Sequence, residues 1–138
     1  MKISASIANS FEKHEVSLET NGNRQSVSIA PKATGFGSSV NRGELLFLAL
    51  ATCYCNDIYR EAAKREIKVE RVEVSVEGDF GAEGEPAANI AYHVKISAEA
   101  SASEIESLIR DTDRVAEIQN TLRIQTPVVL TSIEAVEV

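Results

Sequence analysis

The sequence predicts an α+β fold with a mainly antiparallel sheet, on the basis of two observations. Apolar and polar residues alternate in several short segments that come in pairs, and this alternation is typical of strands with one buried and one wet face. Between the pairs, a long stretch from about Asn41 to Arg65 has no proline and only Gly43 as a glycine, which indicates a helix. Strands and helices therefore occur in separate runs, as in antiparallel α+β domains.

The N-terminal part predicts a β-hairpin. Apolar and polar residues alternate in segments 14–20 and 24–30, with Val27 and Ile29 on one face of the second segment. The Asn-Gly pair that begins at Asn21 separates the two segments and is typical of a hairpin turn. Residues 2–8 alternate in the same way and predict a neighbouring strand.

A second hairpin is predicted in the C-terminal half. Residues 70–80 and 89–97 alternate strictly, so each strand has one apolar face. The closing stretch 127–138 is rich in β-branched residues and predicts a last strand. Pro127 would begin that strand, where its missing N–H is tolerated.

Helix starts are marked by two capping boxes, in which a polar residue is followed three positions later by glutamate. Asn41 with Glu44 begins the long helix, and Ser101 with Glu104 begins a later one. Helical spacing of apolar residues continues to about Leu122 with a break near "DTD", so the later region predicts two short helices or one kinked helix.

The long helix has an unusual distribution of polarity. Its first half, "ELLFLALATCYC", is apolar all round, whereas its second half, "NDIYREAAKRE", carries charge. A helix that is apolar all round must be buried on every side, and one sheet face of a small domain cannot supply that cover. We therefore expect a long buried central helix and a homodimer that packs two such helices together.

Length and composition narrow the class of protein. The 138 residues suit a single domain, 1–138, and no apolar stretch approaches the length of a membrane span. A net charge of −7 without a basic cluster argues against a nucleic-acid partner. The N-terminal segment has no apolar signal core, so we expect a cytoplasmic protein that contacts no membrane.

Cys53 and Cys55 are the only cysteines. On a helix they point about 200° apart, which makes a disulfide between them unfavourable. We expect both to be reduced thiols, either buried in the core or reactive. Two isolated histidines, His14 and His93, make no ligand spacing with the cysteines, so we expect neither a metal nor a cofactor.

The segment "GELLFLALATCYCNDIYREAAKRE" followed by "VERVEVSVEGDF" resembles the OsmC/Ohr family of osmotically induced and organic-hydroperoxide-resistance proteins. The resemblance follows the order of elements from about Val16 onward and is specific over residues 43–60. It implies an OsmC-like fold and an intertwined homodimer with sites at the interface. In the peroxidase branch, a helix cysteine attacks an organic hydroperoxide and a second cysteine on a later helix closes a disulfide.

Cys53 matches the attacking cysteine, and the second cysteine is missing. "AEIQNTL" matches the end of the later family motif, with Ala116 where that cysteine would stand, and the alternative register at Thr126 also lacks one. A sulfenic acid at Cys53 would therefore need an external thiol or another chain for its reduction.

The resemblance also implies an arginine and a glutamate that support the thiolate. Arg24 and Glu44 are the candidates, although the family glutamate falls one position earlier, on Gly43, and Glu44 also has its capping role. From helical spacing alone, Arg60 shares a face with Cys53, and Asp57 between them competes for the guanidinium.

Two functions follow from these residues. One is the reduction of a small apolar hydroperoxide by Cys53 at the dimer interface, in a pocket lined by Leu46, Phe47 and Tyr54, with Asp57 and Arg60 beside it. The alternative is a non-catalytic dimer that binds a small apolar ligand and has lost peroxidase activity. A purely structural protein without a pocket at Cys53 is a third possibility.

Overall fold

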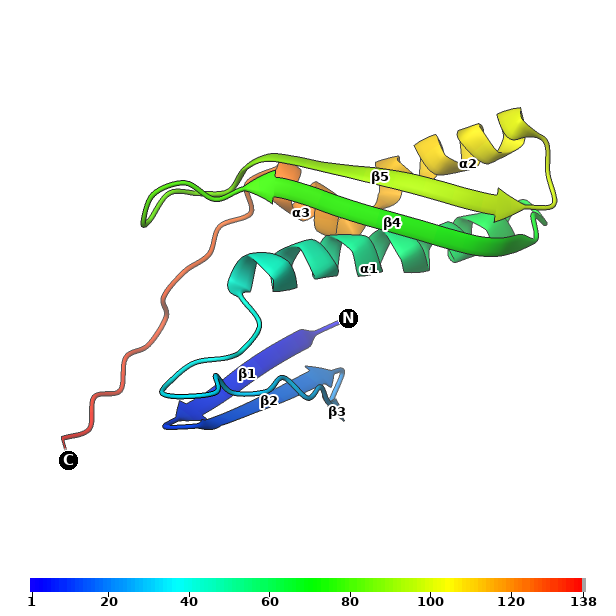
Figure 1. Cartoon of the computed structure of the whole chain (residues 1–138). Coiled ribbons are helices and arrows are strands. Elements are labelled where there is room, and N and C mark those ends of the chain that lie inside the picture. Colours follow the sequence, from blue (N-terminus) through cyan, green and yellow to red (C-terminus); the bar gives the residue numbers. More distant parts are fainter. Residues whose placement is uncertain (138) are drawn as a thin grey trace. The chain divides into compact units, whose positions relative to one another are not determined.

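The structure is a computed structural model, described here for residues 1–137 (Figure 1). Its elements follow the order β1 (Ile3–Ser10), β2 (Lys13–Thr20), β3 (Asn23–Ser26), α1 (Arg42–Ala63), β4 (Val69–Asp79), β5 (Ala88–Ala98), α2 (Ala102–Val115) and α3 (Glu117–Arg123). The chain divides into an N-terminal unit, Met1–Leu46, and a C-terminal unit that begins at Phe47. The predicted α+β class with antiparallel sheets is confirmed, whereas the single domain stays a prediction.

The N-terminal unit contains a three-stranded antiparallel sheet in the order β1-β2-β3. Asn21 and Gly22 turn the chain between β2 and β3 with φ values of 50° and 83°. Positive φ at both central residues is the geometry that favours Asn-Gly in a two-residue hairpin loop. The predicted hairpin turn is therefore present.

The third strand is shorter than predicted. β3 ends at Ser26, so the expected strand over 24–30 is wrong in its second half. The chain leaves the sheet there and closes a loop in which the Ser39 N–H donates to the Ala30 carbonyl at 2.9 Å. Beyond it, Pro31 forms an isolated antiparallel bridge with Ser38, so the chain from Val27 onward pairs within this loop instead of with β2.

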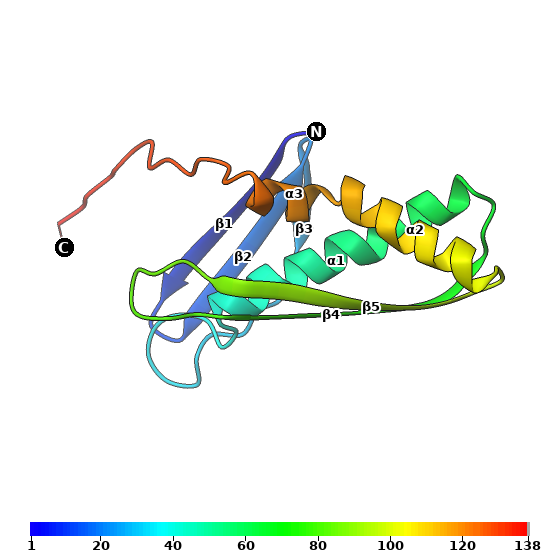
Figure 2. The same cartoon turned by 90° about the horizontal axis from the view of Figure 1, so that it is seen from above.

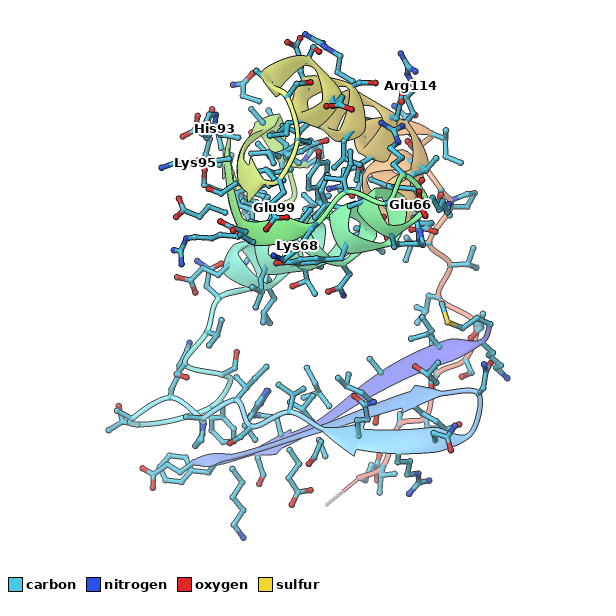
Figure 3. The ribbon with its side chains drawn as sticks, turned by 90° about the vertical axis from the view of Figure 1, so that its right-hand side faces the viewer. Glu66, Lys68, His93, Lys95, Glu99 and Arg114 are labelled. Carbon is cyan, nitrogen blue, oxygen red and sulfur yellow. The ribbon has the colours of Figure 1, made fainter. Side chains whose placement is uncertain are left out.

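In the C-terminal unit, the β4–β5 hairpin presents one face to the helices. Figure 2 shows α2 and α3 on the same side of this hairpin as α1. The valines at alternate positions of β4 are half-buried, and the residues between them are exposed. In Figure 3, His93 and Lys95 of β5 point away from the helices. The predicted alternation of one packed and one wet face is thus confirmed.

The core of this unit lies between the helices and the hairpin. Its fully buried side chains come from both long helices and from the α2–α3 junction: Tyr54, Ile58, Ala62, Leu108 and Ala116. Half-buried valines of β4 and aliphatic residues of β5 pack against this cluster. Burial of apolar surface at these positions supplies the main favourable term for folding of the unit.

The first half of α1 is only partly buried in a single chain, so its burial on every side by a second chain stays a prediction. Leu50 and Tyr54 are buried, but Leu48 has 61% of its surface exposed. Within the C-terminal unit, the buried face of the helix packs against the hairpin and α2. None of the helices in residues 1–137 is both long and apolar enough to cross a bilayer.

The C-terminal segment does not form the predicted strand. Its described part, 127–137, lies in neither helix nor strand, and it is drawn in orange and red in Figure 1. A strand requires a neighbour for its backbone hydrogen bonds, and none pairs with this segment in the described chain. Val128 is 98% exposed.

Both predicted capping boxes are present. Asn41 Oδ1 accepts from the Glu44 N–H at 3.2 Å, and Glu44 Oε2 accepts from the Asn41 N–H at 2.8 Å. Ser101 and Glu104 make the reciprocal pair at the start of α2. The later region forms two separate helices, which confirms the first of the two predicted alternatives. The break between them lies at Ala116, however, and not at 111–113.

We expect Ser101→Ala to lower the free energy of unfolding by about 1 kcal/mol, because the N-terminal N–H groups of α2 lose a capping acceptor. Urea unfolding followed by circular dichroism measures the change. Ser103→Ala is the matched control: Ser103 Oγ lies 3.3 Å from Ser101 Oγ in the same turn, whereas it is Ser101 Oγ that accepts the Glu104 N–H. Equal stability of the Ser101→Ala variant and wild type would contradict the capping role.

Candidate functional site

Cys53 lies in α1, and its side chain is half-buried. Its Sγ accepts the backbone N–H of Ile118 at 3.5 Å. Its thiol donates to Asp57 Oδ2, one helical turn further along α1, at 3.5 Å. Ile118 belongs to the first turn of α3, so the sulfur lies where α1 meets the start of another helix.

Asp57 and Arg60 form an ion pair beside the sulfur. Arg60 Nη1 lies 2.9 Å from Asp57 Oδ1 and 3.5 Å from Glu117 Oε1. Arg60 Nε donates to Glu61 Oε1 at 3.0 Å. Three carboxylates therefore share one guanidinium, and the contacts of Arg60 are to these carboxylates and not to the sulfur.

The electrostatic surroundings oppose ionisation of the thiol. Burial raises the pKa of Cys53 above its ordinary value, and the charges of Asp57 and Glu117 raise it further. The Ile118 N–H lowers the same pKa because it stabilises the thiolate. Burial and the neighbouring Glu117 also raise the pKa of Asp57, against the lowering effect of Arg60.

The other residues that the family resemblance pointed to have partners of their own. Glu44 is engaged in the capping box at the start of α1. Arg24 belongs to the N-terminal unit, where its Nε donates to Glu19 Oε2 at 3.4 Å. Cys55 is half-buried, and both cysteines are free thiols, as expected. Roles for Arg24 and Glu44 at Cys53 stay predictions.

The residues predicted to line a pocket differ in their environments. Leu46 and Phe47 are half-buried, and the Phe47 ring lies 5.8 Å from that of Phe80 between centroids. Gly78 allows this packing, because a Cβ there would lie 2.8 Å from Phe47 Cζ. Their contribution to a substrate pocket stays a prediction.

Tyr54 points into the core. Its ring packs on Tyr92 at 5.3 Å between centroids, and its hydroxyl donates to the Ile109 carbonyl at 2.8 Å. Burial raises the pKa of both tyrosines well above the ordinary value. A cavity of about 380 Å³ is lined by Tyr54, Tyr92, Asp113 and neighbouring residues, and Cys53 is not among them.

A group of possible metal ligands also lies at this point. One donor atom each from Cys53, Asp57 and Glu117 lies within 4.8 Å of the others. However, Arg60 already places a positive charge against two of the three. That guanidinium offsets part of the negative charge that a cation would meet, and the expected absence of a metal stays a prediction.

Reasoning from single residues missed Glu117 and Ile118 as neighbours of the sulfur. They are far from Cys53 in the sequence, and their approach depends on how α3 packs against α1. The match of "AEIQNTL" to the later family motif was the available signal, because it placed this segment near the attacking cysteine.

Comparisons with known proteins agree with this architecture. The family model described as OsmC-like protein matches residues 35–131. An OsmC like protein from Mycoplasma pneumoniae is similar with a TM-score of 0.60 and 22% identity, over 88% of this chain and 86% of that one. An organic hydroperoxide resistance protein OsmC from Legionella pneumophila is similar with a TM-score of 0.60 and 20% identity, over 89% of this chain and 90% of that one.

A further similar structure is a putative organic hydroperoxide resistance protein from Vibrio cholerae with captopril bound in one of its active sites. Its TM-score is 0.54 at 21% identity, over 89% of this chain and 85% of that one. A search of curated proteins found no significant match. Because the family model covers most of the sequence and the fold agrees, the chain belongs to the OsmC-like protein family.

Proposed function

We propose that this protein reduces organic hydroperoxides by a one-cysteine mechanism at Cys53. The observation that carries the proposal is the place of the sulfur: it is half-buried, accepts the Ile118 N–H and donates to Asp57. An N–H aimed at the sulfur stabilises a thiolate, which is the nucleophilic form. Membership of the OsmC-like family and the names of two similar structures support the same reaction.

The cycle would differ from a two-cysteine cycle in its second half. Attack on the hydroperoxide gives a sulfenic acid at Cys53 and an alcohol. Ala116 stands where the family resemblance places the second cysteine, and the remaining thiol, Cys55, points about 200° away from Cys53 on the same helix. An external thiol would form a mixed disulfide with Cys53, and a second thiol would release it.

Apolar residues support the proposed substrate class and the proposed partner. Leu46 and Phe47 favour a small hydroperoxide with an alkyl or aryl group. Leu48 is exposed on α1 in one chain, which supports a homodimer that covers this face of the helix. A cycle that consumes reduced thiols suits the cytoplasm, where thiols are kept reduced.

One observation favours the alternative of a ligand-binding dimer without peroxidase activity. The pKa of Cys53 is raised by burial and by nearby carboxylates, so less thiolate is present at neutral pH than for a free thiol. In that case Cys53 would be a packed thiol in the wall of an apolar site.

The test is to add one equivalent of cumene hydroperoxide to the reduced protein, followed by excess dithiol. We expect Cys53 to gain one oxygen and the dithiol to remove it, as shown by intact mass and peptide mapping. The Cys55→Ser variant should behave like wild type, whereas Cys53→Ser should consume no hydroperoxide above the background rate. Oxidation of Cys53 no faster than that of free cysteine would instead support the ligand-binding alternative.

A further inference from the structure

We propose that Asp57 is a catalytic residue of this site, which accepts the proton of the Cys53 thiol and then donates it to the alkoxide that leaves the hydroperoxide. The inference rests on the proposed function and assigns the proton transfers within it. Asp57 is well placed for this role because it contacts the reacting sulfur directly.

The geometry fixes the carboxylate of Asp57 in one orientation. Asp57 is only 5% exposed. Its Oδ1 is held by Arg60 at 2.9 Å, and its Oδ2 accepts the Cys53 thiol at 3.5 Å. The oxygen on the guanidinium side anchors the group, while the other oxygen faces the sulfur and is available to exchange a proton with it.

The reaction balances with these groups alone. The proton of the Cys53 thiol moves to Asp57 Oδ2, and the sulfur electron pair attacks the terminal peroxide oxygen. The S–O bond forms as the O–O bond breaks, and the alkoxide takes the proton from Asp57. The sulfur is oxidised to a sulfenic acid, the hydroperoxide is reduced to an alcohol, and the Asp57 carboxylate is restored.

The surroundings suit Asp57 to carry this proton. An alkoxide is a strongly basic leaving group, so a proton donor in the transition state speeds its departure. Burial and Glu117 raise the pKa of Asp57, which makes it a better proton acceptor than an exposed aspartate. The other charged groups around the sulfur are Glu117, which is exposed, and Arg60, which is engaged by three carboxylates.

The test uses two reactions of the same thiol that differ in their leaving groups. Iodoacetamide releases iodide, which needs no proton, whereas cumene hydroperoxide releases an alkoxide. Asp57→Asn removes a negative charge that raises the pKa of Cys53. We therefore expect this variant to be alkylated faster than wild type at pH 7 and to react with cumene hydroperoxide about a hundredfold more slowly.

Glu117→Gln is the matched control. It removes a second charge that raises the pKa of Cys53 but leaves the Asp57 contact to the sulfur in place. We expect Glu117→Gln to be alkylated faster than wild type and to reduce hydroperoxide less than about tenfold more slowly, because it lowers the pKa of Asp57 but keeps the carboxylate against the sulfur. All proteins carry Cys55→Ser, so that Cys53 is the only thiol measured.

The outcomes separate this inference from the proposed function. If Asp57→Asn is alkylated faster than wild type but reduces hydroperoxide more slowly, proton transfer by Asp57 is supported. If this variant reduces hydroperoxide as fast as wild type, or loses both reactions equally, the role of Asp57 is overturned and the peroxidase proposal stands. If wild type itself does not react with cumene hydroperoxide above the rate of free cysteine, both are overturned.

A measurement on wild type alone covers the case in which Asp57→Asn does not fold. Perbenzoic acid releases a carboxylate, which leaves without a proton, so its reaction with Cys53 gains little from an acid. The rate ratio of cumene hydroperoxide to perbenzoic acid should be about tenfold higher or more for the protein than for free cysteine at the same pH. An equal ratio would overturn the role of Asp57.

Discussion

Replacing Ala116 by cysteine is expected to change the product of the hydroperoxide reaction from a sulfenic acid to a disulfide with Cys53. Ala116 lies in the core cluster that Cys53 packs against, two residues before the N–H that contacts the sulfur. The family resemblance places the second cysteine at this position. The variant should lose two hydrogens on reaction, whereas wild type gains one oxygen, and intact mass distinguishes them.

The new side chain enters a fully buried position, so we expect Ala116→Cys to lower the free energy of unfolding by about 1–3 kcal/mol. Val115→Cys is the matched control, because Val115 is adjacent in the chain and exposed. A disulfide in the Val115→Cys protein as well would mean that the α2–α3 junction is mobile. A stable sulfenic acid in Ala116→Cys would show that this position is not equivalent to the family cysteine.

The fold could be predicted from the sequence wherever the signal was local. Alternating residues in β4 and β5, the Asn-Gly turn and both capping boxes depend on neighbours only a few positions apart, and the structure contains all of them. The stretch 127–137 shows the opposite case. Its β-branched residues favour an extended strand, but a strand also needs a partner, which the sequence of one chain does not specify.

The candidate site could be predicted only in part. The spacing of Cys53, Asp57 and Arg60 on one helical face was enough to predict that they lie together, and the structure places them in contact. Their neighbours Glu117 and Ile118 come from another helix, so no spacing rule could identify them. The position of Cys53 along α1 likewise gave no indication of the N–H that the start of α3 supplies to the sulfur.

Two aspartates introduced into the C-terminal segment are expected to weaken dimerisation more than any other change considered. Five large apolar side chains there are exposed in one chain: Val128, Val129, Leu130, Ile133 and Val136. Apolar patches of this kind mark interaction sites, and we propose that a second copy of the chain covers them in the homodimer. Val128→Asp with Leu130→Asp places two charges on one face of the strand that this segment would form.

We expect wild type to have twice the mass of one chain in light scattering, and the double aspartate variant to have a dimer dissociation constant raised about a hundredfold, or about 2.8 kcal/mol. Because these side chains are exposed in the single chain, the substitutions should leave the fold of the monomer intact by circular dichroism. Thr131→Asp with Ala135→Asp is the matched control for charge, because both residues lie on the opposite face of that strand. A double variant that dimerises as tightly as wild type would remove this segment from the interface, and a monomeric wild type would overturn the homodimer itself.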